Sequence, residues 1–162
     1  VCTAPDATGI TAILTGGSAA TYHAPGLVNS FDPDFVMTLR SDAAPGQAVL
    51  EELGYELVGQ EYRHATNPFQ LDFPPGPLAV GVEILSSWQT VRRGDLALYV
   101  LTATDSCLDR LAHGFYYGSR KCQDDARRIA EVNRLDIERM RGWAQVEGCT
   151  ADMERFLARL AR

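Results

Sequence analysis

The chain has 162 residues, the length of one domain, and its 46% hydrophobic and 22% charged residues exclude a fibrous or disordered protein. No stretch approaches the roughly 18–20 apolar residues of a membrane-spanning helix, so we expect no membrane partner. The net charge is −6, with 11 acidic and 4 basic residues in 1–104, against 10 and 11 in 105–162, and this acidic first part argues against nonspecific duplex binding.

The first predicted elements are a strand, a glycine turn and a helix. Residues 10–15, Ile-Thr-Ala-Ile-Leu-Thr, are short, apolar and partly β-branched, which predicts a buried strand. Gly16 and Gly17 follow directly and indicate a tight turn. Ser18 is expected to cap a short helix that extends to about His23.

Five further segments continue the α/β pattern. Residues 34–39 predict a second strand, and residues 45–53 predict a helix that begins at a proline and stops before a glycine. Residues 55–62 alternate loosely and residues 69–73 form a compact run before a proline cluster, so we expect a strand in each. Residues 99–102 predict one more short strand.

The apolar period changes to that of a helix from residue 105 onward. We therefore expect an α/β core in residues 1–104 and a helical subdomain in residues 105–162, packed together as a single domain. The apolar stripes that predict these helices are Leu108, Leu111, Ala112 and Phe115, then Ile137, Met140, Trp143 and Ala144, then Met153, Phe156, Leu157 and Leu160.

Three aspartates form a candidate metal site. Asp32 and Asp34 are two residues apart at the start of a predicted strand, which places both carboxylates on one face. Asp72 alternates with the apolar residues around it, so it points away from the buried face of its strand. Each acid alone is more typical of a turn or a solvent-facing position. If the two strands are neighbours, however, the three converge on a site for Mg²⁺ or Mn²⁺.

The glycine turn offers a complementary phosphate site. Gly16 and Gly17 let backbone amides approach a phosphate, and the helix start that follows favours negative charge. A strand-to-helix turn that needs a positive φ is the alternative interpretation of the same two glycines. The combination with the aspartates favours nucleotide binding.

The order of these motifs resembles that of the polymerase-beta-like nucleotidyltransferase superfamily, in particular its minimal, AbiEii-like bacterial branch. The resemblance rests on Gly16-Gly17-Ser18-Ala19, on Ser30-Phe31-Asp32-Pro33-Asp34-Phe35 and on Leu71-Asp72-Phe73, and it extends over residues 10–162. Pro33 departs from the aliphatic residue usual between the paired acids and indicates an edge position or a distorted strand start.

The resemblance implies a nucleotidyltransferase-type mixed sheet flanked by helices. It also implies that Gly16, Gly17, Ser18 and Ser30 hold a nucleoside triphosphate, while Asp32, Asp34 and Asp72 bind magnesium. The expected reaction moves a nucleoside monophosphate to an acceptor hydroxyl on RNA, protein or a small molecule. The branch further implies a role in a toxin–antitoxin or phage-defence system.

Several residues of the helical half are secondary candidates. Asp109, Arg110 and Lys121 carry charges that could meet the substrate, although an internal ion pair at Asp109 and solvent exposure of Lys121 are the plainer interpretations. Asp105 is expected to cap its helix. Tyr116 and the tyrosine after it offer stacking surfaces for a base, but aromatic residues at helical spacing are more often core or contact residues.

The cysteines and the chain start indicate a cytoplasmic protein. Cys2, Cys107, Cys122 and Cys149 share no metal-ligand spacing, so we expect free and mostly buried thiols. Residues 1–9 have neither the basic head nor the apolar core of a signal peptide. The histidines share no motif with a serine or cysteine and are expected at the surface or as caps.

Two alternative functions stay open. The first is a catalytically degenerate module that keeps the fold and acts by binding a cognate protein partner or a second copy of itself. The second is a phosphohydrolase that uses the same acids and releases phosphate without an acceptor. Magnesium-dependent nucleotide binding separates the degenerate module from the two enzymes.

Overall fold

The computed structural model of the chain describes residues 2–6, 10–30, 32–39, 46–74 and 76–160. Its helices are α1 (Thr3–Asp6), α2 (Gly16–His23), α3 (Gly46–Glu52), α4 (Ala103–Tyr116), α5 (Arg120–Val132), α6 (Ile137–Val146) and α7 (Thr150–Leu160). Its strands are β1 (Ile10–Leu14), β2 (Phe35–Leu39), β3 (Tyr55–Val58), β4 (Glu61–His64), β5 (Ala79–Val80), β6 (Glu83–Ile84), β7 (Gln89–Arg93) and β8 (Leu96–Val100).

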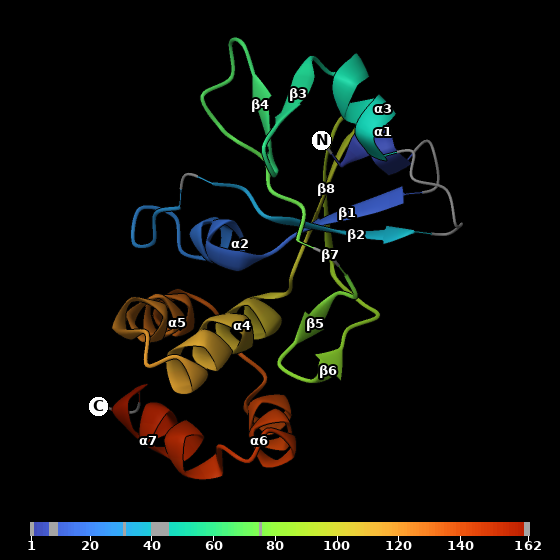
Figure 1. The fold of residues 1–162 in the computed structure, drawn as a ribbon. Coiled ribbons are helices and arrows are strands. Elements are labelled where there is room, and N and C mark those ends of the chain that lie inside the picture. Colours follow the sequence, from blue (N-terminus) through green and yellow to red (C-terminus); the bar gives the residue numbers. More distant parts are fainter. Residues whose placement is uncertain (1, 7–9, 31, 40–45, 75, 161–162) are drawn as a thin grey trace.

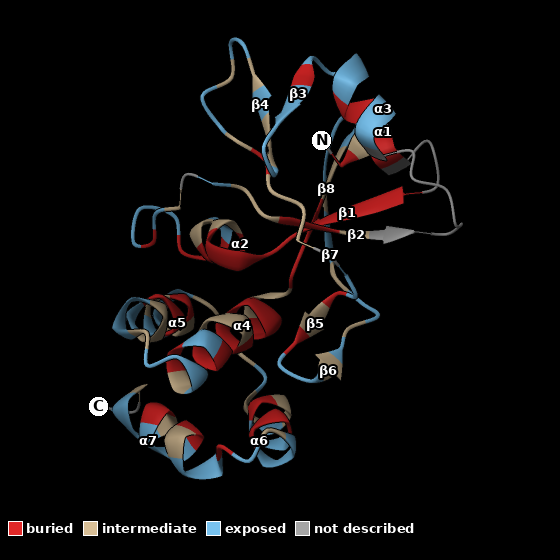
Figure 2. Ribbon diagram, viewed as in Figure 1, coloured by how far each residue is buried: buried red, intermediate tan, exposed pale blue. Residues whose placement is uncertain are grey.

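A mixed sheet in the order β2–β1–β8–β7 forms the centre of the fold, and α4 to α7 follow it (Figure 1). The prediction of a mixed α/β fold with a helical C-terminal half is confirmed. β1 is buried along its whole length, as its apolar and β-branched residues require (Figure 2). It pairs antiparallel with β2 at Ile13 and Val36, and parallel with β8 at Ile13 and Tyr99.

The strand predicted over residues 55–62 is wrong in its length. The chain turns at Gly59, which has a φ of 72°, and β3 and β4 form an antiparallel hairpin on either side of it. The loose alternation of this segment came from two short strands whose exposed and half-buried residues resemble one continuous pattern. Glycine tolerates the left-handed conformation that such a turn demands.

The other predicted elements differ mainly in their ends. Within residues 69–73 only Leu71 and Asp72 make sheet bridges, Leu71 to Tyr62 and Asp72 to Asp34. The strand predicted at 99–102 begins earlier, at Leu96, and ends at Val100. The helix predicted over residues 45–53 is α3, and Pro45 lies outside the described residues.

The helix after the glycine turn begins three residues earlier than expected. Thr15 occupies the N-cap position of α2 without a side-chain cap bond, so the cap predicted at Ser18 is wrong. The Ser18 hydroxyl instead donates a hydrogen bond to the backbone oxygen of Asp32, 3.2 Å away. Because Gly16 is the first residue of α2, the turn and the helix start coincide.

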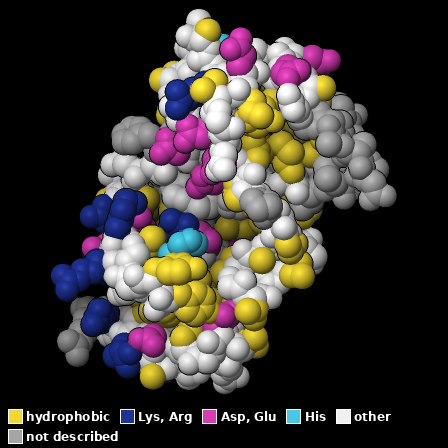
Figure 3. All heavy atoms as spheres, viewed as in Figure 1, with side chains coloured by type: hydrophobic (Ala, Val, Ile, Leu, Met, Phe, Trp, Pro, Cys, Tyr) yellow, Lys and Arg dark blue, Asp and Glu magenta, His cyan; other side chains and the backbone are white. Residues whose placement is uncertain are grey.

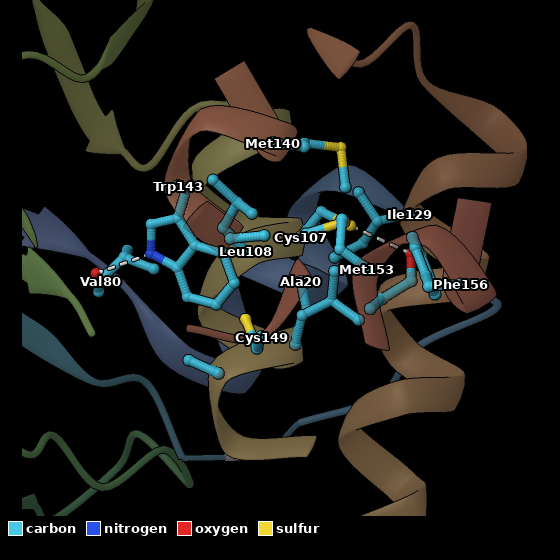
Figure 4. Packing of buried hydrophobic residues seen from close by; sticks show 14 of the residues in the cluster. Ala20, Val80, Cys107, Leu108, Ile129, Met140, Trp143, Cys149, Met153 and Phe156 are labelled. Atoms are coloured by element: carbon cyan, nitrogen blue, oxygen red, sulfur yellow. Dashed lines mark hydrogen bonds between the residues drawn. The ribbon is translucent and has the colours of Figure 1, made fainter. Parts of the chain in front are cut away.

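The helical half has its own apolar cluster (Figure 4). The predicted stripes supply half of its buried residues, including Leu108 of α4, Trp143 of α6 and Met153 of α7. The indole Nε1 of Trp143 donates a hydrogen bond to the backbone oxygen of Val80, at 3.1 Å, which ties α6 to the β5–β6 hairpin. The periodicity therefore identified the faces that pack together.

Helix α2 joins the two parts of the molecule. It lies between the sheet and the helices α4 and α5 (Figure 1), and it contacts both of these helices. Ala20 and Ala24 belong to the helical cluster, whereas Ala19 belongs to the cluster that surrounds the sheet. Small side chains on both sides let α2 approach both layers closely.

The helix predicted to be capped by Asp105 is capped by another residue. Thr102 is the N-cap of α4, and its hydroxyl oxygen accepts a hydrogen bond from the backbone N–H of Asp105. The Asp105 carboxylate is buried and accepts from Arg139 Nε at 3.0 Å and Nη2 at 2.6 Å. Arg139 Nη1 also donates to Glu83 at 2.9 Å, so one guanidinium links α4, α6 and the β5–β6 hairpin.

Arg139→Leu is expected to destabilise the protein by about 2–3 kcal/mol, because it leaves the buried Asp105 carboxylate without two of its hydrogen bonds. Urea unfolding would measure this loss. Arg141→Leu on the same helix is the matched control, since its ion pair with Glu154 is exposed to solvent and is expected to contribute little to stability. Equal losses in the two variants would contradict the role of Arg139.

The four cysteines form no disulfide, and Cys2, Cys107 and Cys149 are buried, as expected from the sequence. Burial raises the pKa of the Cys107 thiol to about 12, so this thiol stays protonated and unreactive. Within the described residues, no helix is both long enough and apolar enough to cross a membrane.

Candidate active site

Three backbone segments meet at the end of β1, where the chain enters α2. The backbone N–H of Thr15 donates to the oxygen of Asp34 at 2.9 Å. On the other side, Phe35 N–H donates to the oxygen of Asp72 at 2.8 Å, and Asp72 N–H donates to the oxygen of Pro33 at 3.2 Å. The two acidic segments are therefore neighbours, which was the condition for their carboxylates to converge. Although Pro33 has no N–H group, no sheet hydrogen bond is lost here, because only the carbonyl of Pro33 takes part in the pairing with Asp72.

The glycines let polar side chains approach the turn closely. Gly16 has a φ of 63°, and a Cβ on it would collide with Oδ2 of Asp34. A Cβ on Gly17 would lie 2.7 Å from Oγ of Ser30. The backbone conformation at Gly16 therefore requires glycine, and a side chain at Gly17 would require Ser30 to shift. The structure thus brings Gly16, Gly17, Ser30 and Asp34 together around the start of α2, and the Ser18 hydroxyl holds the loop that carries Asp32.

A cavity of about 370 Å³ opens beside this turn. Gly16, Asp34 and Asp72 line it from the sheet side, and Asp109 and Arg110 of α4 line it from the helical side. Figure 3 shows acidic side chains, basic side chains and a histidine close together between the upper, sheet-containing part and the lower, helical part. The cavity thus combines two of the three primary acids, Asp34 and Asp72, with two of the three secondary candidates.

The electrostatics of the cavity centre on Asp34. Burial raises the pKa of its carboxyl, and the nearby Asp72 raises this pKa further. Arg110 acts in the opposite direction, whereas Asp32 and Asp109 add smaller unfavourable contributions. Several carboxylates therefore lie near a single positive charge, that of Arg110. A bound cation would reduce the repulsion among these carboxylates.

Arg110 is held in place by its neighbour. Its Nε and Nη2 donate to Oδ2 of Asp109 at 3.0 and 2.6 Å, and the two side chains are 11% and 15% exposed. Asp109 therefore makes the ion pair expected for it. Although burial opposes the charge, Asp109 raises the pKa of Arg110, so the guanidinium remains a permanent cation at the edge of the cavity.

The carboxylates can contribute to a magnesium site but do not complete one. Within the described ranges, no group of three or more histidine, cysteine or acidic residues is arranged to hold a metal ion. Asp34 and Asp72 both line the cavity, whereas Asp32 is exposed and is not among its lining residues. Mg²⁺ commonly takes one or two carboxylates and completes its shell with water and substrate phosphates, so the donors Asp34 and Asp72 fit that ion.

One of the two basic candidates, Lys121, lies elsewhere, as does Arg120 beside it in the sequence. Lys121 Nζ forms an ion pair with Asp125 at 2.8 Å, its side chain is 67% exposed, and it does not line the cavity. Arg120 lines a separate cleft between α5 and α7. Of the basic residues proposed from the sequence, Arg110 alone lies at the carboxylates.

The structure places His113 at the cavity and His23 in the protein interior. His113 is exposed, and its Nδ1 lies 3.0 Å from the backbone oxygen of Asp109, one helical turn earlier. The spacing of four residues between Asp109 and His113 was the sequence signal that could have placed both side chains on one face of α4. His23 is buried, which lowers the pKa of its imidazole, and its Nε2 bonds to the Leu101 oxygen at 2.7 Å. The expectation of a surface or capping role is therefore wrong for His23.

Comparisons of the chain with models of known protein families, with curated proteins and with solved structures gave no match.

Proposed function

We propose that the protein is a nucleotidyltransferase that uses Mg²⁺ or Mn²⁺ and moves a nucleoside monophosphate from a nucleoside triphosphate to an acceptor hydroxyl. The observation that carries the proposal is the hydrogen-bonded juxtaposition of the Asp34 and Asp72 segments with the Gly16 turn, at a cavity that Arg110 also lines. The four cysteines, which form no disulfide, suit a reducing compartment, so a cytoplasmic location is part of the proposal.

The phosphates would bind at the start of α2. The first N–H groups of a helix lack intrahelical partners and carry partial positive charge, and glycine leaves them accessible. Gly16 and Gly17 supply such amides beside Asp34. Arg110, fixed by Asp109, adds a charge that stabilises the negative phosphate oxygens as they rearrange.

The carboxylates have two tasks in the proposed reaction. When bound, the metal ion neutralises phosphate charge, and Asp34 and Asp72 would hold it. The acceptor oxygen forms a bond to the α-phosphorus while the bond to pyrophosphate breaks, and Asp72 accepts the hydroxyl proton. The N–H of Phe73 donates to Asp72 Oδ1 at 2.8 Å, which fixes the direction of that carboxylate.

Calorimetric titration with ATP, GTP, CTP and UTP tests the binding step. We expect at least one triphosphate to bind in the presence of Mg²⁺, and binding to be lost without the metal or in Asp34→Asn. Asp95→Asn, at an exposed site outside the cavity, is the control and keeps the affinity of the wild type. Failure of all four triphosphates to bind would contradict the proposal.

A second candidate function is a degenerate module that binds a protein partner, as in a toxin–antitoxin or phage-defence pair, or that forms a homodimer. Its specific support is a group of exposed apolar side chains around the β5–β6 hairpin and the end of α6. Val82, Ile84 and Val146 are 71%, 67% and 71% exposed. Large exposed apolar side chains gathered in one region are typical of contact surfaces. This candidate predicts no triphosphate binding in the titration above.

A further inference from the structure

An aromatic groove begins where the carboxylate cavity ends. It has a volume of about 480 Å³, and Tyr116, Tyr117 and Val82 are among its lining residues. Asp109 and His113 line both the groove and the carboxylate cavity. A ligand bound at the carboxylates can therefore continue into the groove along one surface.

The groove is held together by a carboxylate that joins three elements. Glu147, at the end of α6, accepts a hydrogen bond from the Val82 N–H at 2.7 Å and another from the Tyr116 hydroxyl. Gly81 makes room for this carboxylate, since a Cβ at Gly81 would collide with Glu147 Oε1. The groove is thus preformed, which lowers the entropic cost of binding a ligand.

Tyr117 is the exposed aromatic side chain of the groove. It is 79% exposed, whereas Tyr116 is 46% exposed and is fixed by Glu147. The ring centroid of Tyr117 lies 5.8 Å from that of His113. Single exposed aromatic residues are common, but here three rings line one groove whose volume lies in the range of ligand sites.

The charges of the groove favour a neutral, planar ligand. Its ionisable side chains include the carboxylates of Asp109 and Glu147, which would repel a phosphate. The start of α2, in contrast, favours phosphate, and its first residue, Gly16, lines the sheet side of the adjoining cavity. A triphosphate bound at the glycine turn would therefore direct its uncharged end toward the tyrosines.

We propose that this groove binds the nucleobase of the triphosphate, stacked on Tyr117. This inference rests on the proposed function, because it assumes that the phosphates bind at the carboxylate cavity. Base stacking on an aromatic side chain tolerates any base, since every base has a π-face. The groove thus contributes affinity for a nucleoside over bare polyphosphate.

Titration with two ligands tests the groove separately from the carboxylates. The ligands are the tightest-binding of the four nucleoside triphosphates and inorganic tripolyphosphate, each with Mg²⁺. Tyr117→Ala is expected to weaken nucleoside triphosphate binding about tenfold and to leave tripolyphosphate binding unchanged. Tyr117→Phe keeps the ring and therefore the affinity. Tyr22→Ala removes a tyrosine of α2 that is 37% exposed and is the control with unchanged affinities.

The outcomes separate the two proposals. An unchanged affinity of Tyr117→Ala for the nucleoside triphosphate, or an equal loss for both ligands, would overturn the base site while the nucleotidyltransferase proposal stands. If neither ligand binds to the wild type in the presence of Mg²⁺, the proposed function fails and the base site fails with it.

Discussion

Asp34→Asn is expected to lower the rate of nucleotidyl transfer by at least about 10²–10³-fold while the protein stays folded. The substitution keeps the shape of the side chain but removes the charge beside Gly16 and Asp72 that the metal and the phosphates require. Transfer would be measured as labelled nucleoside monophosphate incorporated into the RNA, protein and small-molecule fractions of a bacterial lysate. Asp95→Asn is the matched control and keeps the rate.

The same variant is expected to be as stable as the wild type or more stable at neutral pH. The pKa of Asp34 in the folded protein is raised above its usual value of 3.8, mainly by burial and then by Asp72. The folded state therefore binds this proton more tightly than the unfolded state, and stability falls as the pH rises from the usual pKa through the raised one. Asparagine removes this loss, so Tm at neutral pH should not decrease. A lower Tm together with retained transfer would contradict the assigned role of Asp34.

Gly16→Ala is expected to abolish magnesium-dependent nucleotide binding and to destabilise the fold by more than the backbone effect alone. An alanine in the left-handed conformation costs about 1–2 kcal/mol. At Gly16 the added Cβ also collides with the Asp34 carboxylate, so that carboxylate must move away from the turn. The expected result is lost binding in calorimetry and a larger decrease in the free energy of unfolding than at a glycine with free space.

Gly26→Ala provides that reference. Gly26 has a φ of 76°, and a Cβ on it would meet nothing within 4 Å, so this variant carries the backbone cost without a collision. Its nucleotide affinity should equal that of the wild type. If Gly16→Ala and Gly26→Ala bind nucleotide equally well, the close approach of Asp34 to the turn has no functional role.

The sequence predicted those parts of the fold in which local pattern and burial agree. β1 is apolar except for Thr11 and is buried throughout, and the predicted apolar stripes of α4, α6 and α7 match the buried faces of these helices. β7 was missed because it is an edge strand whose side chains, except for the half-buried Val91, are exposed, so it has no apolar alternation. The β3–β4 hairpin was missed because Gly59 interrupts an already weak pattern.

The candidate site was predictable to the extent that it follows from strand neighbours. The convergence of Asp34 and Asp72 required only that their segments lie side by side, which the bridge between them shows. To decide whether Arg110 or Lys121 lies at the carboxylates, one must know how α4 and α5 are oriented. The spacing of residues in the sequence does not give that orientation. Arg110 faces the cavity, whereas Lys121 pairs with Asp125 in an exposed position.

The most direct test of the central claim is a crystal structure of the protein with Mn²⁺ and a non-hydrolysable nucleoside triphosphate. The anomalous signal of manganese locates the ion without reference to any assumed ligand. We predict an anomalous peak between the carboxylates of Asp34 and Asp72, with the triphosphate against the amides of Gly16 and Gly17. A triphosphate bound elsewhere, or a manganese peak away from both carboxylates, would contradict the proposed nucleotidyltransferase site.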